Sequence, residues 1–127
     1  MEAYGYRIEG PSERVGLEGQ RRTVSLAFTG DTDLCESMCD MADGADLLLA
    51  EAAFVEGRDT MRGMHLTGKR AGQLAAGTAG KMPRLPVGQL VLTHIQPWTE
   101  HRIPLRNAAL VYNGPLEAAT AGATWEI

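Results

Sequence analysis

Three short apolar runs, each closely followed by a polar side chain, constrain the fold of this chain more than any other feature. The runs span residues 24–28, 47–50 and 90–93, and they lead to Asp31, Glu51 and His94. Short, nearly continuous apolar runs are typical of strands that are covered on both faces of a sheet. In open α/β sheets, ligands bind at the carboxyl ends of the strands. The pattern therefore predicts a functional site at one edge of a sheet.

The composition is that of one ordinary globular domain. The chain has 127 residues, of which 44% are hydrophobic and 22% charged, which is enough for one core. Its 15 glycines favour a loop-rich α/β protein over a helical bundle. The net charge of −4 argues against a general basic face for nucleic acid, and no apolar stretch approaches the roughly 20 residues of a transmembrane helix. We expect a cytoplasmic protein with no membrane contact.

Strands and helices are expected to alternate along the chain. We expect strands at residues 3–9, 24–28, 46–51 and 89–94, and a closing pair of strands at 116–118 and 124–127. We expect helices from about 34 to 41, after a cap at Thr67, and from about 104 to 112, with loops at 10–21, 55–64 and 77–88. Asp33 or Thr32 is expected to cap the first helix. This alternation predicts an α/β sheet.

Two cysteines, Cys35 and Cys39, lie four positions apart in the first expected helix. No further thiol accompanies them, so they make a poor zinc site. We interpret both as small buried hydrophobic residues of a reduced, cytosolic chain.

Each candidate site residue has an ordinary structural explanation when it is considered alone. Asp31 follows a strand and a glycine, where Asx-turns and helix caps occur. Glu51 can cap a loop, His65 lies just before an expected helix, and His94 can be a core histidine. His101 lies in a polar segment and is expected to be exposed.

Taken together, the same residues indicate metal-assisted chemistry. An aspartate and a histidine at the ends of neighbouring strands are suitable ligands for zinc or manganese. A second histidine with a glutamate partner matches the requirement for an oriented general acid.

Four motifs occur in order along the chain. They are Phe-Thr-Gly-Asp-Thr at 28–32, Ala-Asp-Leu-Leu-Leu-Ala-Glu at 45–51, His-Leu-Thr at 65–67 and Leu-Val-Leu-Thr-His-Ile-Gln-Pro-Trp at 90–98. Together they resemble the C-terminal half of a metallo-β-lactamase-fold hydrolase, in particular the ribonuclease Z-like branch, which includes bacterial cyclic-nucleotide phosphodiesterases. The resemblance spans nearly the whole chain. It implies an α/β fold in which residues 1–127 form one half of an αββα sandwich.

The resemblance implies a role for each matching residue. Asp31 would bridge two divalent metals, Zn²⁺ or alternatively Mn²⁺, and His94 would be a terminal ligand of one of them. His65, held by Glu51, would give a proton to the leaving oxygen or steady the scissile phosphate, while the metals activate a water. A basic cluster near His65 would either steer a phosphate or form a solvated face; it comprises Arg58, Arg62, Lys69 and Arg70.

The chain departs from the family at one point. The main metal motif of the family, His-x-His-x-Asp-His, lies in the N-terminal half and is absent from this sequence, which has three histidines. We therefore expect a late gene start, a truncation or a split gene. The remaining half would expose the apolar face that its partner half covers, and its own ligands would be too few to hold two metals tightly.

Two functions from different classes follow. The first is a metal-dependent phosphodiesterase that acts on a nucleotide, either a cyclic nucleotide or an RNA 3′ end. The acidic charge slightly favours the small molecule. The alternative is an inactive half-domain that binds a partner or forms a homodimer. A thioesterase or lactonase of the same fold is disfavoured by His65 and its Glu51 partner.

Overall fold

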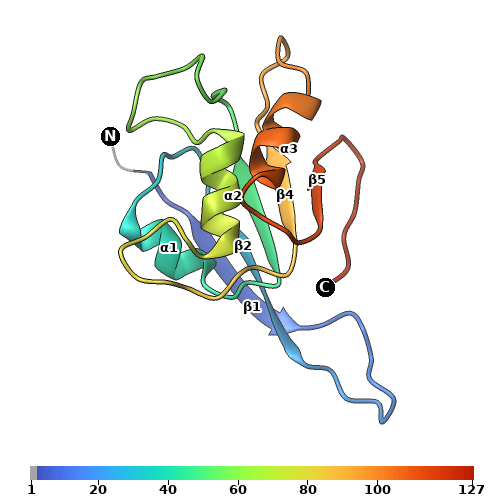
Figure 1. Cartoon of the computed structure of the whole chain (residues 1–127). Helices are drawn as coiled ribbons and strands as arrows, with labels where there is room; N and C mark the ends of the chain where they lie inside the picture. The colour runs from blue at the N-terminus through green and yellow to red at the C-terminus, as the bar shows by residue number, and fades with distance from the viewer. Residues whose placement is uncertain (1–2) are drawn as a thin grey trace.

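A computed structural model describes residues 3–127, in which strands and helices alternate (Figure 1). The strands are β1 (Tyr6–Pro11), β2 (Thr23–Phe28), β3 (Leu47–Glu51), β4 (Leu90–Thr93) and β5 (Leu116–Ala118). The helices are α1 (Glu36–Ala42), α2 (Gly68–Ala76) and α3 (Arg102–Ala109). The three apolar runs are the strands β2, β3 and β4, as the sequence predicts.

The strands form one sheet in the order β1-β2-β3-β4-β5. β1 pairs antiparallel with β2 through a long hairpin, and β2 to β5 run parallel to one another. A helix connects each pair of successive parallel strands. Because such crossovers are right-handed and the strand order never reverses, the three helices lie on the same face of the sheet (Figure 1). The predicted α/β sheet is confirmed.

The hydrophobic core lies between this face of the sheet and the helices. The strands contribute fully buried side chains to it, among them Ala27, Leu48, Ala50, Leu90 and Leu92. The second helix contributes a face of mainly small residues, since Ala71, Leu74 and Ala75 of α2 are buried in the same cluster. These small side chains let α2 lie close to the strands whose ends carry the candidate site.

Helices α2 and α3 also approach each other closely. An added Cβ at Gly68 would lie 2.3 Å from the carbonyl oxygen of Pro104, which is backbone and cannot turn away. Thr67 caps α2, because its side chain accepts a hydrogen bond from the backbone N–H of Arg70. The start of α2, and with it the neighbouring His65, is therefore fixed against α3.

Gly68→Ala is expected to lower the free energy of unfolding by about 1–2 kcal/mol. The methyl group must push the two helices apart, at a cost typical of overpacking, and the better helix propensity of alanine offsets only part of this cost. Urea unfolding measures the change. Gly10→Ala is the matched control, because no atom lies within 4 Å of its added Cβ. Equal stability of the two variants would contradict the close contact.

The opposite face of the sheet is apolar and incompletely covered. Tyr6 and Ile8 of β1 are each 60% exposed, and Leu26 and Phe28 of β2 are partly buried. The C-terminal tail covers part of this face, where Trp125 lines a shallow pocket together with Ile8 and Leu26. The predicted exposure of an apolar face is confirmed.

Three expectations about local structure are wrong. Helix α1 begins at Glu36 after Cys35, and neither Asp33 nor Thr32 caps it, because the Asp33 carboxylate binds two arginines instead. Cys35 is exposed, although Cys39 is buried as expected. Residues 124–127 form no strand; they lie beside the β1–β2 hairpin, where the Ile127 carbonyl accepts hydrogen bonds from Ser12 and Glu13.

No helix in the described part of the chain combines the length and the apolar character needed to cross a bilayer.

Candidate metal centre

A tight turn after β2 presents Asp31. Gly30 has φ +61°, and a Cβ at this position would lie 2.6 Å from the Tyr4 carbonyl oxygen, so only glycine fits without strain. The buried Thr29 hydroxyl donates to the Gly30 carbonyl and accepts from the backbone N–H of Glu51, which ties the turn to the end of β3. The Asp31 side chain is 68% exposed, beyond the carboxyl edge of the sheet.

His94, directly after β4, pairs with Asp31. Its Nδ1 lies 3.1 Å from Oδ1 of Asp31. The backbone of His94 has φ +55°. Among residues 3–127, no other non-glycine residue has a positive φ. A left-handed conformation at such a residue costs about 1–3 kcal/mol and persists where the surroundings over-determine it, often at functional sites. The fold thus holds His94 in a strained turn against Asp31.

Glu51, the last residue of β3, orients His65. Its side chain is 1% exposed, and its Oε1 lies 2.7 Å from Nδ1 of His65. The same Oε1 accepts from the backbone N–H of Thr32, and Oε2 accepts from that of Ala53. Three N–H groups therefore hold this carboxylate, and it fixes His65 in the tautomer with the proton on Nδ1, leaving Nε2 for other partners.

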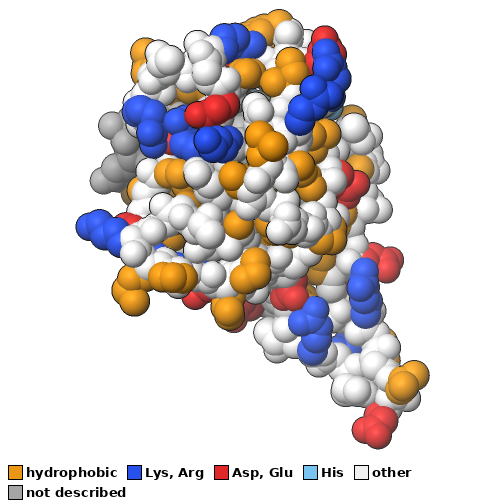
Figure 2. Space-filling model, in the orientation of Figure 1, with side chains coloured by type: hydrophobic (Ala, Val, Ile, Leu, Met, Phe, Trp, Pro, Cys, Tyr) orange, Lys and Arg blue, Asp and Glu red, His pale blue; other side chains and the backbone are white. Residues whose placement is uncertain are grey.

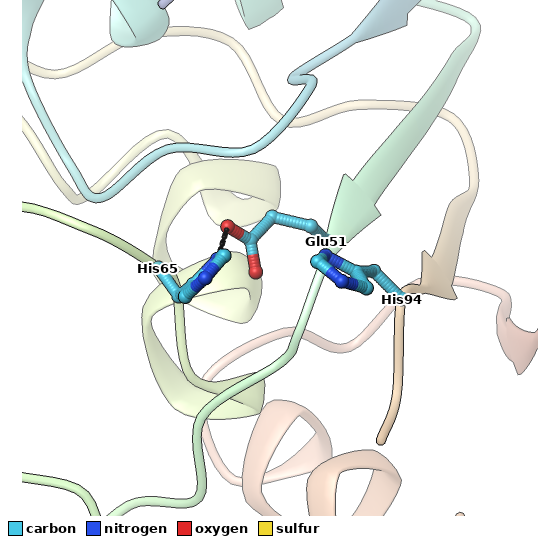
Figure 3. A group of neighbouring side chains, drawn as sticks. All are labelled: Glu51, His65 and His94. Atoms are coloured by element: carbon cyan, nitrogen blue, oxygen red, sulfur yellow. Dashed lines mark hydrogen bonds and ion pairs between the residues drawn. The ribbon is translucent and has the colours of Figure 1, made fainter. Parts of the chain in front are cut away.

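The two pairs meet at the carboxyl edge of the sheet. Glu51, His65 and His94 offer nitrogen and oxygen atoms that all lie within 4.8 Å of one another (Figure 3). The rings of His65 and His94 stand edge to face, with their centroids 5.3 Å apart. All four site residues named from the sequence thus come together. His101, by contrast, is exposed at the start of α3, as expected.

Asp31, His65 and His94 are the types of side chain that commonly bind a divalent cation. One carboxylate and two imidazoles are common zinc ligands, and a catalytic zinc site usually has three protein ligands. Glu51 is less suitable as a ligand, because its oxygens already accept three hydrogen bonds in a buried position. If His65 serves as an acid rather than a ligand, Asp31 and His94 alone fall short of a complete set.

A network around Asp33 supports the site and was not foreseen as such from the sequence. Asp33 is buried, and its Oδ2 accepts hydrogen bonds from Arg62 Nε and the backbone N–H of Gly63, both 2.8 Å away. Its Oδ1 lies 3.0 Å from Nε of Arg70, whose Nη2 donates to the backbone carbonyl of His65. Burial alone would raise the pKa of Asp33, but the hydrogen bonds from Arg62 and the backbone, with the charge of Arg70, hold that pKa below its usual value.

Asp33→Asn is expected to lower the free energy of unfolding by about 3 kcal/mol, because the change leaves the Arg70 guanidinium buried without its counter-charge. Urea unfolding at neutral pH measures this loss. The matched control is Glu100→Gln, which breaks an exposed ion pair with Arg102; exposed pairs contribute about 0–1 kcal/mol. Equal effects of the two changes would show that the Asp33 network does not stabilise the loop before α2.

Three of the four residues in the basic cluster proposed from the sequence are already in ion pairs. Arg62 and Arg70 bind Asp33, and Arg58 binds Asp59. Arg70 is buried rather than solvated. On the face shown in Figure 2, basic and acidic side chains lie next to one another instead of forming a patch of one sign. These arginines therefore stabilise the loop before α2.

A solved structure identifies the fold. The chain superposes on YhfI of Bacillus subtilis, a metallo-β-lactamase-fold protein, with a TM-score of 0.71 and 23% sequence identity. The match covers 95% of this chain and 50% of the YhfI chain. The chain has half of a metallo-β-lactamase fold. This confirms the fold that the four sequence motifs implied.

Sequence relatives match most of this chain but less than half of their own length. An uncharacterized protein of Mycobacterium leprae is 35% identical over 126 residues, which are 99% of this chain and 38% of the relative. A ribonuclease Z of Synechococcus is 42% identical over 96 residues, which are 73% of this chain and 27% of the relative. No family model matches the sequence. The chain thus spans well under two thirds of the length of these relatives.

Proposed function

We propose that this chain is the C-terminal half of a metal-dependent phosphodiesterase that cleaves a nucleotide phosphodiester, either a cyclic nucleotide or an RNA 3′ end. One observation carries the proposal: the Asp31–His94 pair lies beside an imidazole that a buried glutamate orients. The similarity to a ribonuclease Z adds support for a phosphodiester substrate.

Asp31 and His94 would hold divalent metal, Zn²⁺ or Mn²⁺, and further ligands would come from a segment outside the 127 residues. Bound there, the metal would activate a water as nucleophile at neutral pH and offset charge on the phosphate. The φ of +55° at His94 and the hydrogen-bonded turn at Gly30 keep the two ligands in place before any metal arrives. Such preorganisation lowers the cost of binding.

His65 would supply the proton that the leaving oxygen needs. Glu51 accepts from Nδ1, so the protonated ring presents Nε2–H as the free donor. An oriented acid of this kind is typical of reactions with a poor leaving group. A thioesterase would need such an acid less, because a thiolate leaves more readily than an alkoxide.

A chimera tests the proposal. In it, this chain replaces the matching 126-residue segment of the Mycobacterium leprae relative, so that the rest of that protein can complete the domain. We expect the zinc- or manganese-loaded chimera to hydrolyse bis(p-nitrophenyl) phosphate and to leave p-nitrophenyl acetate largely intact. Asp31→Ala and His94→Ala should each abolish turnover. A folded, metal-loaded chimera that hydrolyses only the acetate would refute a phosphodiesterase.

The exposed apolar face favours an alternative function, an inactive half-domain that forms a homodimer. Tyr6 and Ile8 would lie in the dimer interface, since both are 60% exposed on the sheet. Sedimentation velocity tests this alternative. It requires a dimer that Ile8→Lys disrupts and that Leu17→Lys, at a fully exposed position of the hairpin loop, leaves intact. A monomer at all concentrations would exclude it.

A further inference from the structure

A pocket adjoins the candidate metal centre and plays no part in the chemistry described above. It has a volume of about 250 Å³ and lies between the loop after β3 and the segment after β4. Its lining consists of Ala53, Phe54, Arg58, Asp59, Gln96 and Trp98. Pockets for drug-sized ligands measure about 300–1,000 Å³, so this one suits a single ring system.

The two chain segments that line the pocket also carry or contact residues of the candidate metal centre. Phe54 follows Glu51 by three positions, and its ring meets the His65 ring edge to face with centroids 4.9 Å apart. Gln96 and Trp98 follow His94 on the same short segment. A group bound in the pocket would therefore lie next to the phosphate that His65 and His94 address.

The lining selects a flat aromatic group rather than a second phosphate. Trp98 is 74% exposed, so a large aromatic surface is available for stacking. The Arg58 guanidinium donates two hydrogen bonds to Asp59 and one to Thr99, so its charge is already neutralised. Gln96 brings an amide, which both donates and accepts hydrogen bonds. Stacking surface and an amide edge are the usual means of binding a nucleobase.

We propose that this pocket is a nucleobase subsite, in which the base of the substrate stacks on Trp98 and its edge meets the Gln96 amide. This inference rests on the proposed function and names the part of the nucleotide that the chain recognises. The sugar–phosphate would then extend from the pocket past Phe54 toward His65.

Fluorescence of the metal-free chain tests base binding without any turnover. The sequence has two tryptophans, so Trp125→Phe leaves Trp98 as the single reporter. We expect adenosine to quench its emission in a saturable way and inorganic phosphate to have no effect. Gln96→Ala in the same background should weaken the adenosine response. No saturable quenching, or equal responses to adenosine and phosphate, would overturn the subsite.

Kinetics in the chimera separate this inference from the proposed function. Trp98→Ala should raise KM for the p-nitrophenyl ester of adenosine monophosphate about 5- to 150-fold, the range expected for loss of one base stack. Trp98→Ala should leave KM unchanged for methyl p-nitrophenyl phosphate, which has no base. Trp98→Phe should keep KM for the adenosine monophosphate ester close to that of the unsubstituted chimera. If Trp98→Ala raises KM equally for both substrates, the pocket does not bind the base. If the unsubstituted chimera cleaves neither substrate, the proposed function itself fails.

Discussion

His65→Gln is expected to lower kcat for a phosphodiester with an alkoxide leaving group by at least about 10²-fold, the lower end of the range for loss of a general acid. The structure gives the reason. Glu51 holds Nδ1 of His65 at 2.7 Å, and the edge-to-face contact with Phe54 sets the ring plane. Glutamine keeps a polar side chain at this position but provides no acid. The measurement is single-substrate kinetics in the metal-loaded chimera.

The leaving group decides what His65 does. A p-nitrophenolate leaves without a proton, so His65→Gln should cost much less with bis(p-nitrophenyl) phosphate than with an alkyl diester. Equal losses on both substrates would show that His65 binds the phosphate or the metal instead of donating a proton. His101→Gln is the matched control, because His101 is exposed at the start of α3, and it should leave both rates unchanged.

Glu51→Gln is expected to lower the free energy of unfolding by about 1–3 kcal/mol, the usual cost of leaving a buried donor without a partner. Both oxygens of Glu51 accept from N–H groups: Oε1 from Thr32 and His65, and Oε2 from Ala53. A glutamine amide must place its own NH₂ against at least one of these donors. Urea unfolding of the metal-free chain measures the change.

The same substitution also tests the orienting role of Glu51. The NMR resonances of the His65 ring should change, because the strong acceptor at Nδ1 is weakened, while those of His101 stay fixed. Glu9→Gln is the control for stability, since Glu9 forms an exposed pair with Arg7. An unfolding curve and a His65 spectrum that both match the unsubstituted chain would contradict the role assigned to Glu51.

The sequence predicts the site because its residues follow local rules. The runs that become β2, β3 and β4 are short and apolar, and parallel strands bring their carboxyl ends to one edge. Asp31, Glu51 and His94 therefore share an edge by topology alone. The cap of α2 at Thr67 is equally local, since it depends on one hydroxyl and the next turn of the helix.

Contacts between distant segments could not be predicted in this way. Asp33 is a reasonable helix cap by local rules, but the loop before α2 places Arg62 and Arg70 against it. The tail at residues 124–127 has suitable residues for a strand, yet its backbone bonds to the β1–β2 hairpin. In both cases the partner lies far along the chain. Hydrophobic periodicity and turn residues describe only neighbouring positions, so they do not show which distant residues will come into contact.

The central claim is that Asp31 and His94 bind a divalent metal, and histidine NMR during a zinc titration of the metal-free chain tests it most directly. The sequence has three histidines, so each ring can be followed separately, with His101 as an internal reference. Zinc is expected to shift the His94 resonances, and Asp31→Ala is expected to weaken this response about 10- to 100-fold or more. Equal responses at His94 and His101, or a His94 response that Asp31→Ala leaves unchanged, would contradict the central claim.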